Sequence, residues 1–146
     1  MSAKQSGYTL IELMIAVVIV GIVASFAFSG YQQNVRQTKR SDCGGALVSL
    51  AQAMERHYSV NNSYLGAAAS GGNTGAPTIF STSCPVDGGT PSYNLTIAAA
   101  TASTYTLNAA PTGGMADDKC GTLTLTGTGV KGVSSADAGV TWDQCW

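Results

Sequence analysis

The sequence predicts an α+β fold in which one long N-terminal α-helix packs against an antiparallel four-stranded β-sheet. Three observations support this prediction. A largely apolar run opens the chain, helical spacing of apolar residues continues beyond it, and short alternating patterns typical of strands fill the second half. With 146 residues, the chain has room for one modest globular core in addition to this front end.

The composition fits one small domain rather than a nucleic-acid-binding protein. Only 10% of the residues are charged, 45% are hydrophobic, and the formal net charge is -1. Charged residues usually make up about 25% of a soluble domain. The chain therefore lacks the basic excess that marks a dedicated nucleic-acid binder.

The first seven residues form a short polar leader ahead of the apolar run. Residues 13–35 contain no Asp, Glu, Lys or Arg. Because about 20 helical residues cross a bilayer, the first half of the predicted helix is expected to span a membrane. Lys4 is expected to keep the N-terminus in the cytoplasm, with the remaining chain outside the inner membrane. A secretory signal differs, because its small-residue cleavage site follows the apolar run, whereas Gly7 precedes it.

Glu12 is a single carboxylate near the start of this apolar run. A carboxylate is costly in lipid, so such a residue is a functional candidate. Two interpretations stay open. Glu12 lies in the headgroup region and favours the helix N-terminus through the helix dipole, or it pairs with a free α-amine that cleavage after Gly7 would create on Tyr8.

Helical spacing continues beyond the membrane-spanning part to about Tyr58. Gly44 and Gly45 are expected to weaken the helix there. The apolar positions recur every three or four residues and form one stripe on which a sheet can pack: Ala46, Leu47, Leu50, Ala53, Met54, His57 and Tyr58.

Three cations, Arg36, Lys39 and Arg40, follow the apolar run. We interpret them as a solvated helix face or as contacts to lipid headgroups, with Asp42 nearby. A DNA-binding patch would need more cations and aromatic partners. His57 has no nucleophile beside it in the sequence, so we expect it to pack at the edge of the domain.

The second half of the chain predicts the sheet. Residues 61–83 are rich in Gly, Ala, Ser and Thr and are interpreted as a connecting loop. Each of the main strand patterns has one apolar face, as a sheet packed on the helix stripe requires. Four strands are expected, of which the last is the shortest: 93–97, 104–108, 122–126 and 129–133.

The chain has four cysteines, Cys43, Cys84, Cys120 and Cys145. They include no Cys-x-x-Cys pair and are accompanied by a single histidine, which argues against a zinc site. An even number in an exported chain favours two disulfides. Four cysteines allow three pairings, and their positions alone leave all three open.

No other set of residues predicts a metal site, a cofactor or an enzyme. Asp117 and Asp118 are adjacent, and we expect them to be solvated because no spaced series of oxygen ligands for calcium follows them. The glycines form no phosphate-binding motif, and no Ser/His/Asp or Cys/His catalytic set can be assembled. We therefore expect no catalytic residue, no metal and no cofactor.

The run GYTLIELMI, which begins at Gly7, closely resembles the class III signal of type IV prepilins. The resemblance continues through residues 21–24 and into Tyr31, and it covers about the first 35 residues. It implies that a prepilin peptidase cleaves after Gly7 and methylates the new N-terminal residue, which is usually Phe in that family and is Tyr8 here. It also implies that Glu12 guides assembly.

The same resemblance implies the type IV pilin fold and a division of the chain. The expected parts are a leader at 1–7, a transmembrane and filament-core helix at 8–35, and a globular domain at 36–146. Many family members carry a proline near the end of the apolar run, where this chain has Gly30. Whether the helix melts there in a filament stays open.

The C-terminal part resembles the disulfide-bounded D-region of pilins, especially the PilE-like minor pilin subgroup. The segments that carry this resemblance are residues 119–125 and the ending DQCW. The resemblance implies a disulfide between Cys120 and Cys145 that bounds a D-region at 120–145. Cys43 and Cys84 are then expected to form the second disulfide.

Together these features predict a structural subunit that polymerises through its N-terminal helix into a surface filament for adhesion, twitching motility or DNA uptake. The resemblance of the C-terminal part favours a minor rather than a major pilin. The expected partners are other pilin subunits, the prepilin peptidase and the inner-membrane assembly machinery. The precursor is expected in the inner membrane and the assembled subunit in the extracellular filament. Two alternatives stay open. One is a specialised pilin that captures DNA, although the sparse cations argue against strong electrostatic binding. The other is a pseudopilin of a type II secretion machine, which shares the N-terminal signal.

Overall fold

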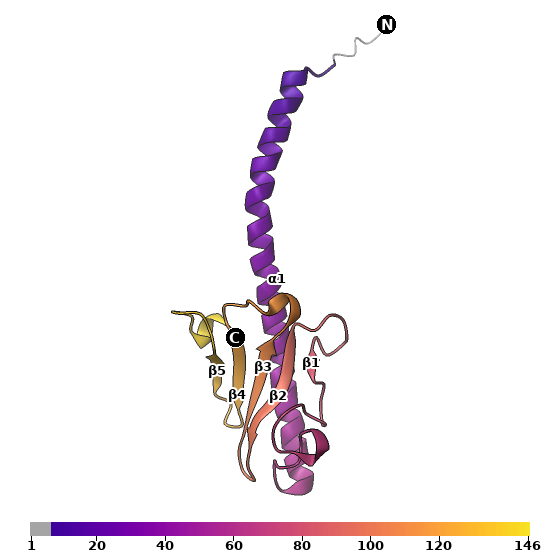
Figure 1. Cartoon of the computed structure of the whole chain (residues 1–146), viewed down its shortest axis with the longest axis vertical. Coiled ribbons are helices and arrows are strands. Elements are labelled where there is room, and N and C mark those ends of the chain that lie inside the picture. The colour runs from indigo at the N-terminus through magenta and orange to yellow at the C-terminus, as the bar shows by residue number, and fades with distance from the viewer. Residues whose placement is uncertain (1–6) are drawn as a thin grey trace. The chain divides into compact units, whose positions relative to one another are not determined.

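The structure, a computed structural model, describes residues 7–146, so the predicted leader lies outside the described residues except for Gly7. The chain divides into two compact units on either side of the boundary between Val35 and Arg36. The helix α1 comprises Leu10–Asn61 and is the only α-helix among the described residues. It begins slightly after the predicted start at Tyr8 and extends slightly beyond Tyr58 (Figure 1).

The N-terminal unit presents apolar side chains to its surroundings. Every described side chain between residues 7 and 34 is exposed. An 18-residue window of α1 has a mean hydropathy of 2.7, so the helix is long and apolar enough to cross a membrane by length and composition.

The second unit contains one antiparallel sheet of five strands in the order β1-β2-β3-β4-β5. The prediction of four strands is therefore wrong by one, although the long helix packed on an antiparallel sheet is confirmed. Successive strands are neighbours in this sheet, which places β1 and β5 at its two edges (Figure 1). The strands comprise Ser83–Cys84 (β1), Tyr93–Ala100 (β2), Tyr105–Pro111 (β3), Thr122–Thr126 (β4) and Lys131–Ser134 (β5).

The missed strand, β1, has two residues, and it pairs Ser83 with Asn94 and Cys84 with Tyr93. A strand of two residues cannot show the alternation that identifies longer strands. The predicted loop before it also contributes to the sheet region, because the backbone N–H groups of Gly75 and Ile97 each donate to the other residue's carbonyl, at 2.9 and 2.8 Å.

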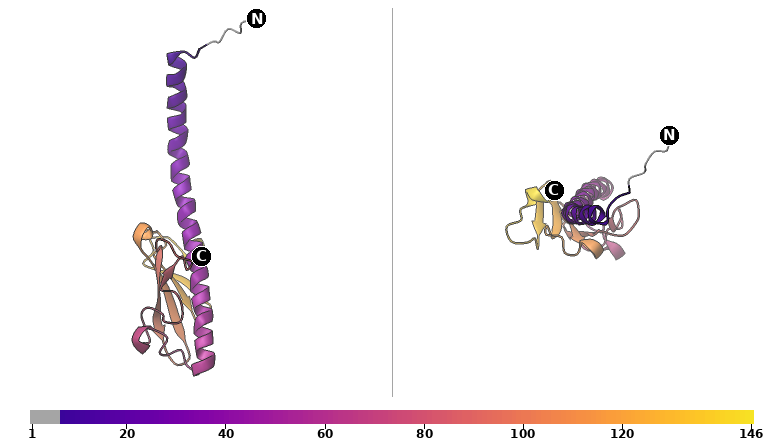
Figure 2. Two further views of the ribbon diagram at one scale, coloured as in Figure 1. Left: turned by 90° about the vertical axis from the view of Figure 1, so that its right-hand side faces the viewer. Right: turned by 90° about the horizontal axis from the view of Figure 1, so that it is seen from above.

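The core of this unit lies between the predicted helix stripe and one face of the sheet (Figure 2). Leu47, Leu50 and Met54 are fully buried on α1. Thr and Asn occupy many of the strand positions that point away from the helix. The positions that face the helix supply buried side chains: Leu95, Ile97, Leu107, Leu123 and Leu125. Each fully buried side chain of this size stabilises the fold by about 1.5–3 kcal/mol relative to an exposed position.

Gly44 and Gly45 lie inside α1 and do not interrupt it. Each costs about 1 kcal/mol in a helix relative to alanine. The helix continues because the residues on either side of the pair, Cys43 and Ala46, are buried against the rest of the core. The expected weakness is therefore outweighed by tertiary packing.

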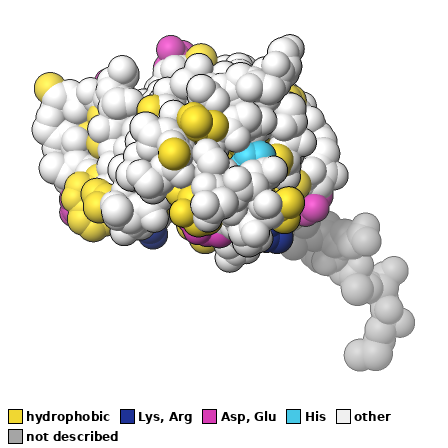
Figure 3. Space-filling view, turned by 90° about the horizontal axis from the view of Figure 1, so that it is seen from below, with side chains coloured by type: hydrophobic (Ala, Val, Ile, Leu, Met, Phe, Trp, Pro, Cys, Tyr) yellow, Lys and Arg dark blue, Asp and Glu magenta, His cyan; other side chains and the backbone are white. Residues whose placement is uncertain are grey.

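His57 is half-buried, and its Nε2 lies 2.9 Å from the carbonyl oxygen of Leu65. The face of the molecule seen from below carries hydrophobic side chains in several separate groups, with few charged side chains between them (Figure 3). The contact with Leu65 gives His57 a packing partner in the segment that follows α1.

Candidate functional site

The start of α1 is closed by a reciprocal pair of hydrogen bonds between Thr9 and Glu12. The backbone N–H of Glu12 donates to Thr9 Oγ1 at 3.3 Å, and the backbone N–H of Thr9 donates to Glu12 Oε2 at 3.5 Å. This pattern is a capping box, in which two backbone donors at a helix start are satisfied by side chains. The Thr-x-x-Glu spacing is the sequence signal that could have indicated it.

The predicted cleavage site lies just ahead of this cap. Gly7 and Tyr8 precede α1 and belong to no helix or strand. The Tyr8 side chain is 83% exposed. The bond between the two residues is therefore outside regular secondary structure, and Tyr8 and Glu12 are close along the chain.

The structure joins Cys43 to Cys84 and Cys120 to Cys145. The Cα–Cα distances are 5.6 and 5.8 Å, within the range that disulfides require. The first disulfide connects α1 to β1. The second connects Cys120, two residues before β4, to Cys145, which follows the short 3-10 helix Trp142–Gln144, so it closes the D-region.

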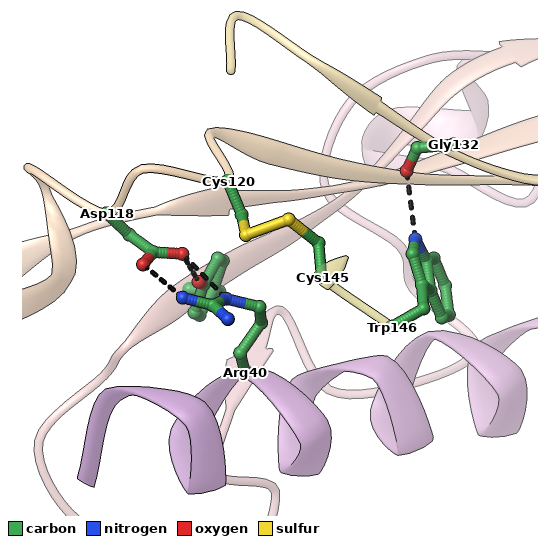
Figure 4. The surroundings of a disulfide bond; sticks show 7 residues. Arg40, Asp118, Cys120, Gly132, Cys145 and Trp146 are labelled. Carbon is green, nitrogen blue, oxygen red and sulfur yellow. Dashed lines mark hydrogen bonds and ion pairs between the residues drawn. A yellow bond between two sulfur atoms is a disulfide. The ribbon is translucent and has the colours of Figure 1, made fainter. Parts of the chain in front are cut away.

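A buried ion pair between Arg40 and Asp118 connects α1 to the loop before β4 (Figure 4). Arg40 Nε donates to Asp118 Oδ2 at 3.0 Å, and Arg40 Nη2 donates to Oδ1 at 2.6 Å. Tyr93 Oη donates to Oδ2 at 2.6 Å. The two charged side chains are 6% and 1% exposed. We call these three residues the Arg40 lock.

The charges of the Arg40 lock stabilise each other. Burial on its own would raise the pKa of Asp118, but the hydrogen bonds from Arg40 and Tyr93 and the positive charge of Arg40 outweigh it and lower the pKa. The hydrogen bond to Asp118 is the main reason that the pKa of Arg40 is raised. Burial, together with the hydrogen bond to Asp118, raises the pKa of the Tyr93 hydroxyl.

Two sequence interpretations are therefore wrong. Arg40 does not belong to a solvated helix face, and Asp118 is not a solvated loop residue. Arg36 also contacts this loop, because its Nη1 donates to the carbonyl oxygen of Asp117 at 3.1 Å. The sequence could not reveal the lock, because Arg40 and Asp118 are 78 residues apart.

A second cluster of polar contacts, near the C-terminal end of α1, surrounds Glu55. Tyr105 Oη donates to Glu55 Oε1 at 2.9 Å, and Tyr64 Oη donates to Oε2 at 3.0 Å. The rings of these two tyrosines meet edge to face with centroids 4.7 Å apart. Burial and the hydrogen bond to Glu55 raise the pKa of Tyr105. Glu55 is not one of the predicted stripe residues, and the sequence pattern does not indicate these partners.

Trp146 covers the exposed edge of β5 (Figure 4). Its Nε1 donates to the carbonyl oxygen of Gly132 at 2.9 Å, and Lys131 Nζ lies 4.9 Å from the centroid of its ring. An edge strand otherwise presents unpaired backbone groups to other chains. A Cβ at Gly44 would lie 3.4 Å from the Trp146 ring, so the ring lies close to the helix at this residue.

Within residues 7–146, no group of three or more His, Cys, Asp or Glu side chains is placed to hold a metal ion. Both carboxylate oxygens of Asp118 accept hydrogen bonds from Arg40 or Tyr93. This arrangement argues against calcium binding at Asp118.

Two family models match the chain. The model described as "Type IV minor pilin ComP, DNA uptake sequence receptor" matches residues 29–124. The model described as "Prokaryotic N-terminal methylation motif" matches residues 2–28. The first match covers more than half of the chain.

The chain is also similar to individual proteins. The type IV major fimbrial protein FimA of Dichelobacter nodosus is 44% identical over 55 residues, which are 38% of this chain and 32% of that protein. The type II secretion system core protein G of Pectobacterium carotovorum subsp. carotovorum is 33% identical over 61 residues, or 42% of this chain and 39% of that protein. The matched part thus spans roughly a third of these curated relatives. A solved type IV pilin from Shewanella oneidensis is 28% identical, with a TM-score of 0.48, covering 76% of this chain and 97% of that chain.

Proposed function

We propose that this chain, which belongs to the ComP family of type IV minor pilins, is a pilus subunit that assembles through its apolar N-terminal helix. The family is one of structural pilins rather than enzymes. The observation that carries the proposal is the exposed apolar first part of α1, most of which lies within the match to the methylation motif and which begins at the Thr9–Glu12 capping box.

The exposed apolar side chains in the first part of α1 require an apolar environment that shields them from water. Large residues such as Leu10, Val17 and Phe26 are more than half exposed. Lipid can cover them before assembly, and the equivalent helices of neighbouring subunits can cover them in a filament. The precursor would then reside in the inner membrane and the mature subunit in an extracellular filament.

Processing would take place at the exposed segment ahead of α1. A prepilin peptidase would cleave after Gly7 and methylate the new amine of Tyr8, and the inner-membrane machinery would then extract the subunit. Two disulfides in the second unit support export to an oxidising compartment.

Glu12 would have two roles in this scheme. Within the subunit it completes the capping box with Thr9. Between subunits its exposed carboxylate would neutralise the α-amine of Tyr8 on a neighbour, because each charge alone is costly in an apolar helix bundle.

Two substitutions separate these roles. Glu12→Gln removes the charge but retains an amide that can complete the capping box, whereas Thr9→Val removes the capping hydroxyl and retains the charge. We expect Glu12→Gln to lower the amount of the chain in sheared filaments by at least about tenfold, which corresponds to 1.4 kcal/mol of assembly free energy. Thr9→Val is expected to assemble at close to the normal level.

Mass spectrometry of sheared filaments provides the readout. The mature chain should lack residues 1–7 and carry one methyl group on Tyr8. Normal assembly of the Glu12→Gln variant, or absence of the chain without substitutions from filaments, would contradict the proposal.

A second candidate function is DNA capture, because the matching family model is described as a DNA uptake sequence receptor. The hydrogen bond from Arg36 to Asp117 brings the first cations of the second unit next to the loop that contains Lys119. Arg36 and Lys119 are therefore two cations at this loop, and Lys39 is exposed three residues after Arg36 on α1, whereas Arg40 is neutralised by Asp118. Few basic side chains are visible on the face seen from below (Figure 3).

So small a number of cations predicts weak, salt-sensitive binding. With about three phosphate contacts, the logarithm of the binding constant should fall with a slope of about -2.7 against the logarithm of salt concentration. Lys39→Ala and Lys119→Ala should each reduce that slope by about 0.9, whereas Arg56→Ala, on a distant helix turn, should not. Gel-shift titrations of the full chain against salt measure this, and an unchanged slope in both lysine variants would exclude DNA capture at this surface.

A further inference from the structure

Three tyrosine rings meet near the C-terminal end of α1, beside the carboxylate of Glu55. The ring centroids of Tyr58 and Tyr64 lie 4.6 Å apart, and those of Tyr64 and Tyr105 lie 4.7 Å apart. Tyr64 and Tyr105 also both donate their hydroxyl to Glu55. We propose that Tyr64 and Tyr105 form a site of oxidative modification, at which a one-electron oxidant joins the two rings by a dityrosine bond.

The shared carboxylate decides which pair of rings reacts. Tyr105 Oη lies 2.9 Å from Glu55 Oε1, and Tyr64 Oη lies 3.1 Å from the same oxygen. Dityrosine forms between ring carbons next to the carbon that bears the hydroxyl, so the reacting ends of these two rings are held close together. Tyr58 also packs on Tyr64, but within residues 7–146 Glu55 accepts hydrogen bonds from Tyr64 and Tyr105 and none from Tyr58.

Glu55 also supplies the proton acceptor that oxidation of a phenol requires. Burial first, and then the hydrogen bond to Glu55, raises the pKa of both Tyr64 and Tyr105 above the ordinary tyrosine value, so both hydroxyls are protonated at neutral pH. Each ring must therefore lose a proton together with its electron, and each hydroxyl proton already points to the Glu55 carboxylate. Because Glu55 is exposed, it can pass these protons on to solvent.

The reaction balances with two equivalents of a one-electron oxidant, such as a metal complex or a peroxidase intermediate. Each equivalent removes one electron, and one proton leaves each hydroxyl through Glu55, which gives two tyrosyl radicals. The radicals pair their unpaired electrons in one carbon–carbon bond between the rings. The hydrogen on each bonded carbon then moves to the oxygen as a proton and restores two phenols. The net change is the loss of two electrons and two protons.

The exposure of the rings defines the route of oxidation. Tyr64 is half-buried, whereas Tyr105 is 5% exposed. The oxidant therefore takes its electrons at Tyr64, and the contact between the rings lets Tyr105 reduce the first Tyr64 radical before the second oxidation. The product joins the segment after α1 to β3, in addition to the two disulfides. This inference does not depend on assembly of the chain into a filament.

Photo-oxidation of the full, detergent-solubilised chain tests the site. The oxidant is a tris(bipyridyl)ruthenium(III) complex, which light generates in the presence of persulfate and which accepts one electron at a time. Denaturing electrophoresis then separates the monomer from chains that have become linked to each other. The monomer should be lighter by two hydrogen atoms and should show dityrosine fluorescence. A monomer without this mass change would overturn the proposal.

Peptide mapping identifies the linked rings. After reduction of the disulfides, trypsin with endoproteinase Asp-N cleaves between Tyr64 and Tyr105 at Asp87. The proposed bond therefore appears as a joined pair of peptides, whereas a bond between Tyr58 and Tyr64 stays within one peptide. A monomer in which the dityrosine joins Tyr58 to Tyr64 would contradict the assignment.

Phenylalanine variants provide matched controls, because each keeps the ring and removes only the hydroxyl. Tyr64→Phe and Tyr105→Phe should each abolish the joined peptide pair. Tyr58→Phe should leave its yield unchanged, although the Tyr58 ring packs on Tyr64 at 4.6 Å. Loss of the joined pair in Tyr58→Phe, or its persistence in Tyr105→Phe, would overturn the proposal.

Glu55→Gln separates proton transfer from geometry. The amide oxygen can still accept hydrogen bonds from the tyrosines but is a much weaker base, so the rate of cross-linking should fall by at least about tenfold while the same peptide pair forms. Arg56→Gln changes an exposed neighbour and is the control, with an expected rate close to that of the original chain. Equal rates in the two variants would exclude Glu55 as the proton acceptor.

Oxidation of the chain in urea tests whether the folded structure directs the reaction. Unfolding separates the rings from each other and from Glu55, so the yield of the joined Tyr64–Tyr105 peptide pair should fall by at least about tenfold relative to the folded chain. An equal yield in urea would show that the two tyrosines react by random encounter, and the proposed site would be wrong.

Discussion

At the scale of single residues, the most consequential contact in the second unit is the Arg40 lock. It places a buried cation of α1 on a buried carboxylate of the loop before β4, with Tyr93 of β2 as a third partner. Replacing one member of such a pair leaves an uncompensated buried charge, which is costlier than losing the attraction. The lock therefore ties three elements together through one carboxylate.

Removing one side of the lock should destabilise the second unit strongly. Arg40→Met is expected to lower the free energy of unfolding by about 3–5 kcal/mol, because Asp118 remains buried without its cation. Urea unfolding of the detergent-solubilised chain, followed by tryptophan fluorescence, measures the change. Lys39→Met removes a neighbouring exposed cation as the control, and the prediction is wrong if the two variants unfold alike.

The lock also predicts a pH dependence. The pKa of Asp118 in the folded chain lies below its ordinary value of 3.8, so the folded state holds this proton less tightly than the unfolded state does. The stabilisation is fully present above pH 3.8 and is lost as the pH falls below that value towards the pKa of the folded state.

Asp118→Asn should remove this part of the acid sensitivity, although it lowers stability at neutral pH. Chemical unfolding measured between about pH 2 and pH 7, a range that brackets the carboxylate pKa values, gives the slope of the unfolding free energy against pH for the variant and for the original chain. Parallel curves for the variant and the unmodified chain would show that other carboxylates cause the acid sensitivity.

At the scale of elements, α1 combines an exposed apolar part with a part that packs on the sheet. Its two adjacent glycines differ in their surroundings. A Cβ at Gly45 would meet nothing within 4 Å, whereas a Cβ at Gly44 would lie 3.4 Å from the Trp146 ring. The same helix turn is therefore free on one side and in contact with the C-terminal segment on the other.

This difference gives opposite expectations for two substitutions. Gly45→Ala should stabilise the second unit by about 1 kcal/mol, because alanine favours the helix and meets no neighbour. Gly44→Leu should displace Trp146 from Gly132 and destabilise the unit, with a shift of tryptophan emission. Urea unfolding and fluorescence spectra measure both effects, and equal stability changes in the two variants would contradict this account.

At the scale of the whole molecule, two disulfides and the Arg40 lock hold the second unit at three places. Cys43–Cys84 joins α1 to the β1 edge, and Cys120–Cys145 joins the start of β4 to the C-terminal segment beside β5. The cross-links therefore tie both edges of the sheet region to the rest of the unit.

Removing the second disulfide should weaken the unit and the β5 edge together. Cys120→Ser with Cys145→Ser opens a loop of 25 residues and is expected to lower the free energy of unfolding by about 3–4 kcal/mol. Proteolysis should begin within residues 127–146, because Trp146 loses its anchor. Urea unfolding and mass spectrometry of the fragments measure these effects, and first cleavage within residues 61–83 would contradict the expectation.

Features that depend on neighbours along the chain were predicted well. The apolar run, the helix stripe at Leu47 and Leu50, and the strand alternation at Leu95 and Leu107 are all periodic patterns, and the structure has a helix or strand at each. The family resemblance at the N-terminus is supported by the match to the methylation motif. Cleavage after Gly7 and the assembly role of Glu12 remain predictions.

The long apolar helix, its packing stripe and the main strands follow from the sequence alone, because helical and strand periodicity depends on residues a few positions apart. Only the tertiary structure decided that Arg40 meets Asp118, that Ser83–Cys84 adds an edge strand, and that Trp146 covers Gly132. Such contacts join distant segments, so they depend on how the sheet packs against the helix. A charged residue whose sequence neighbours predict solvent exposure can therefore be buried when the fold places an oppositely charged residue from a distant segment beside it.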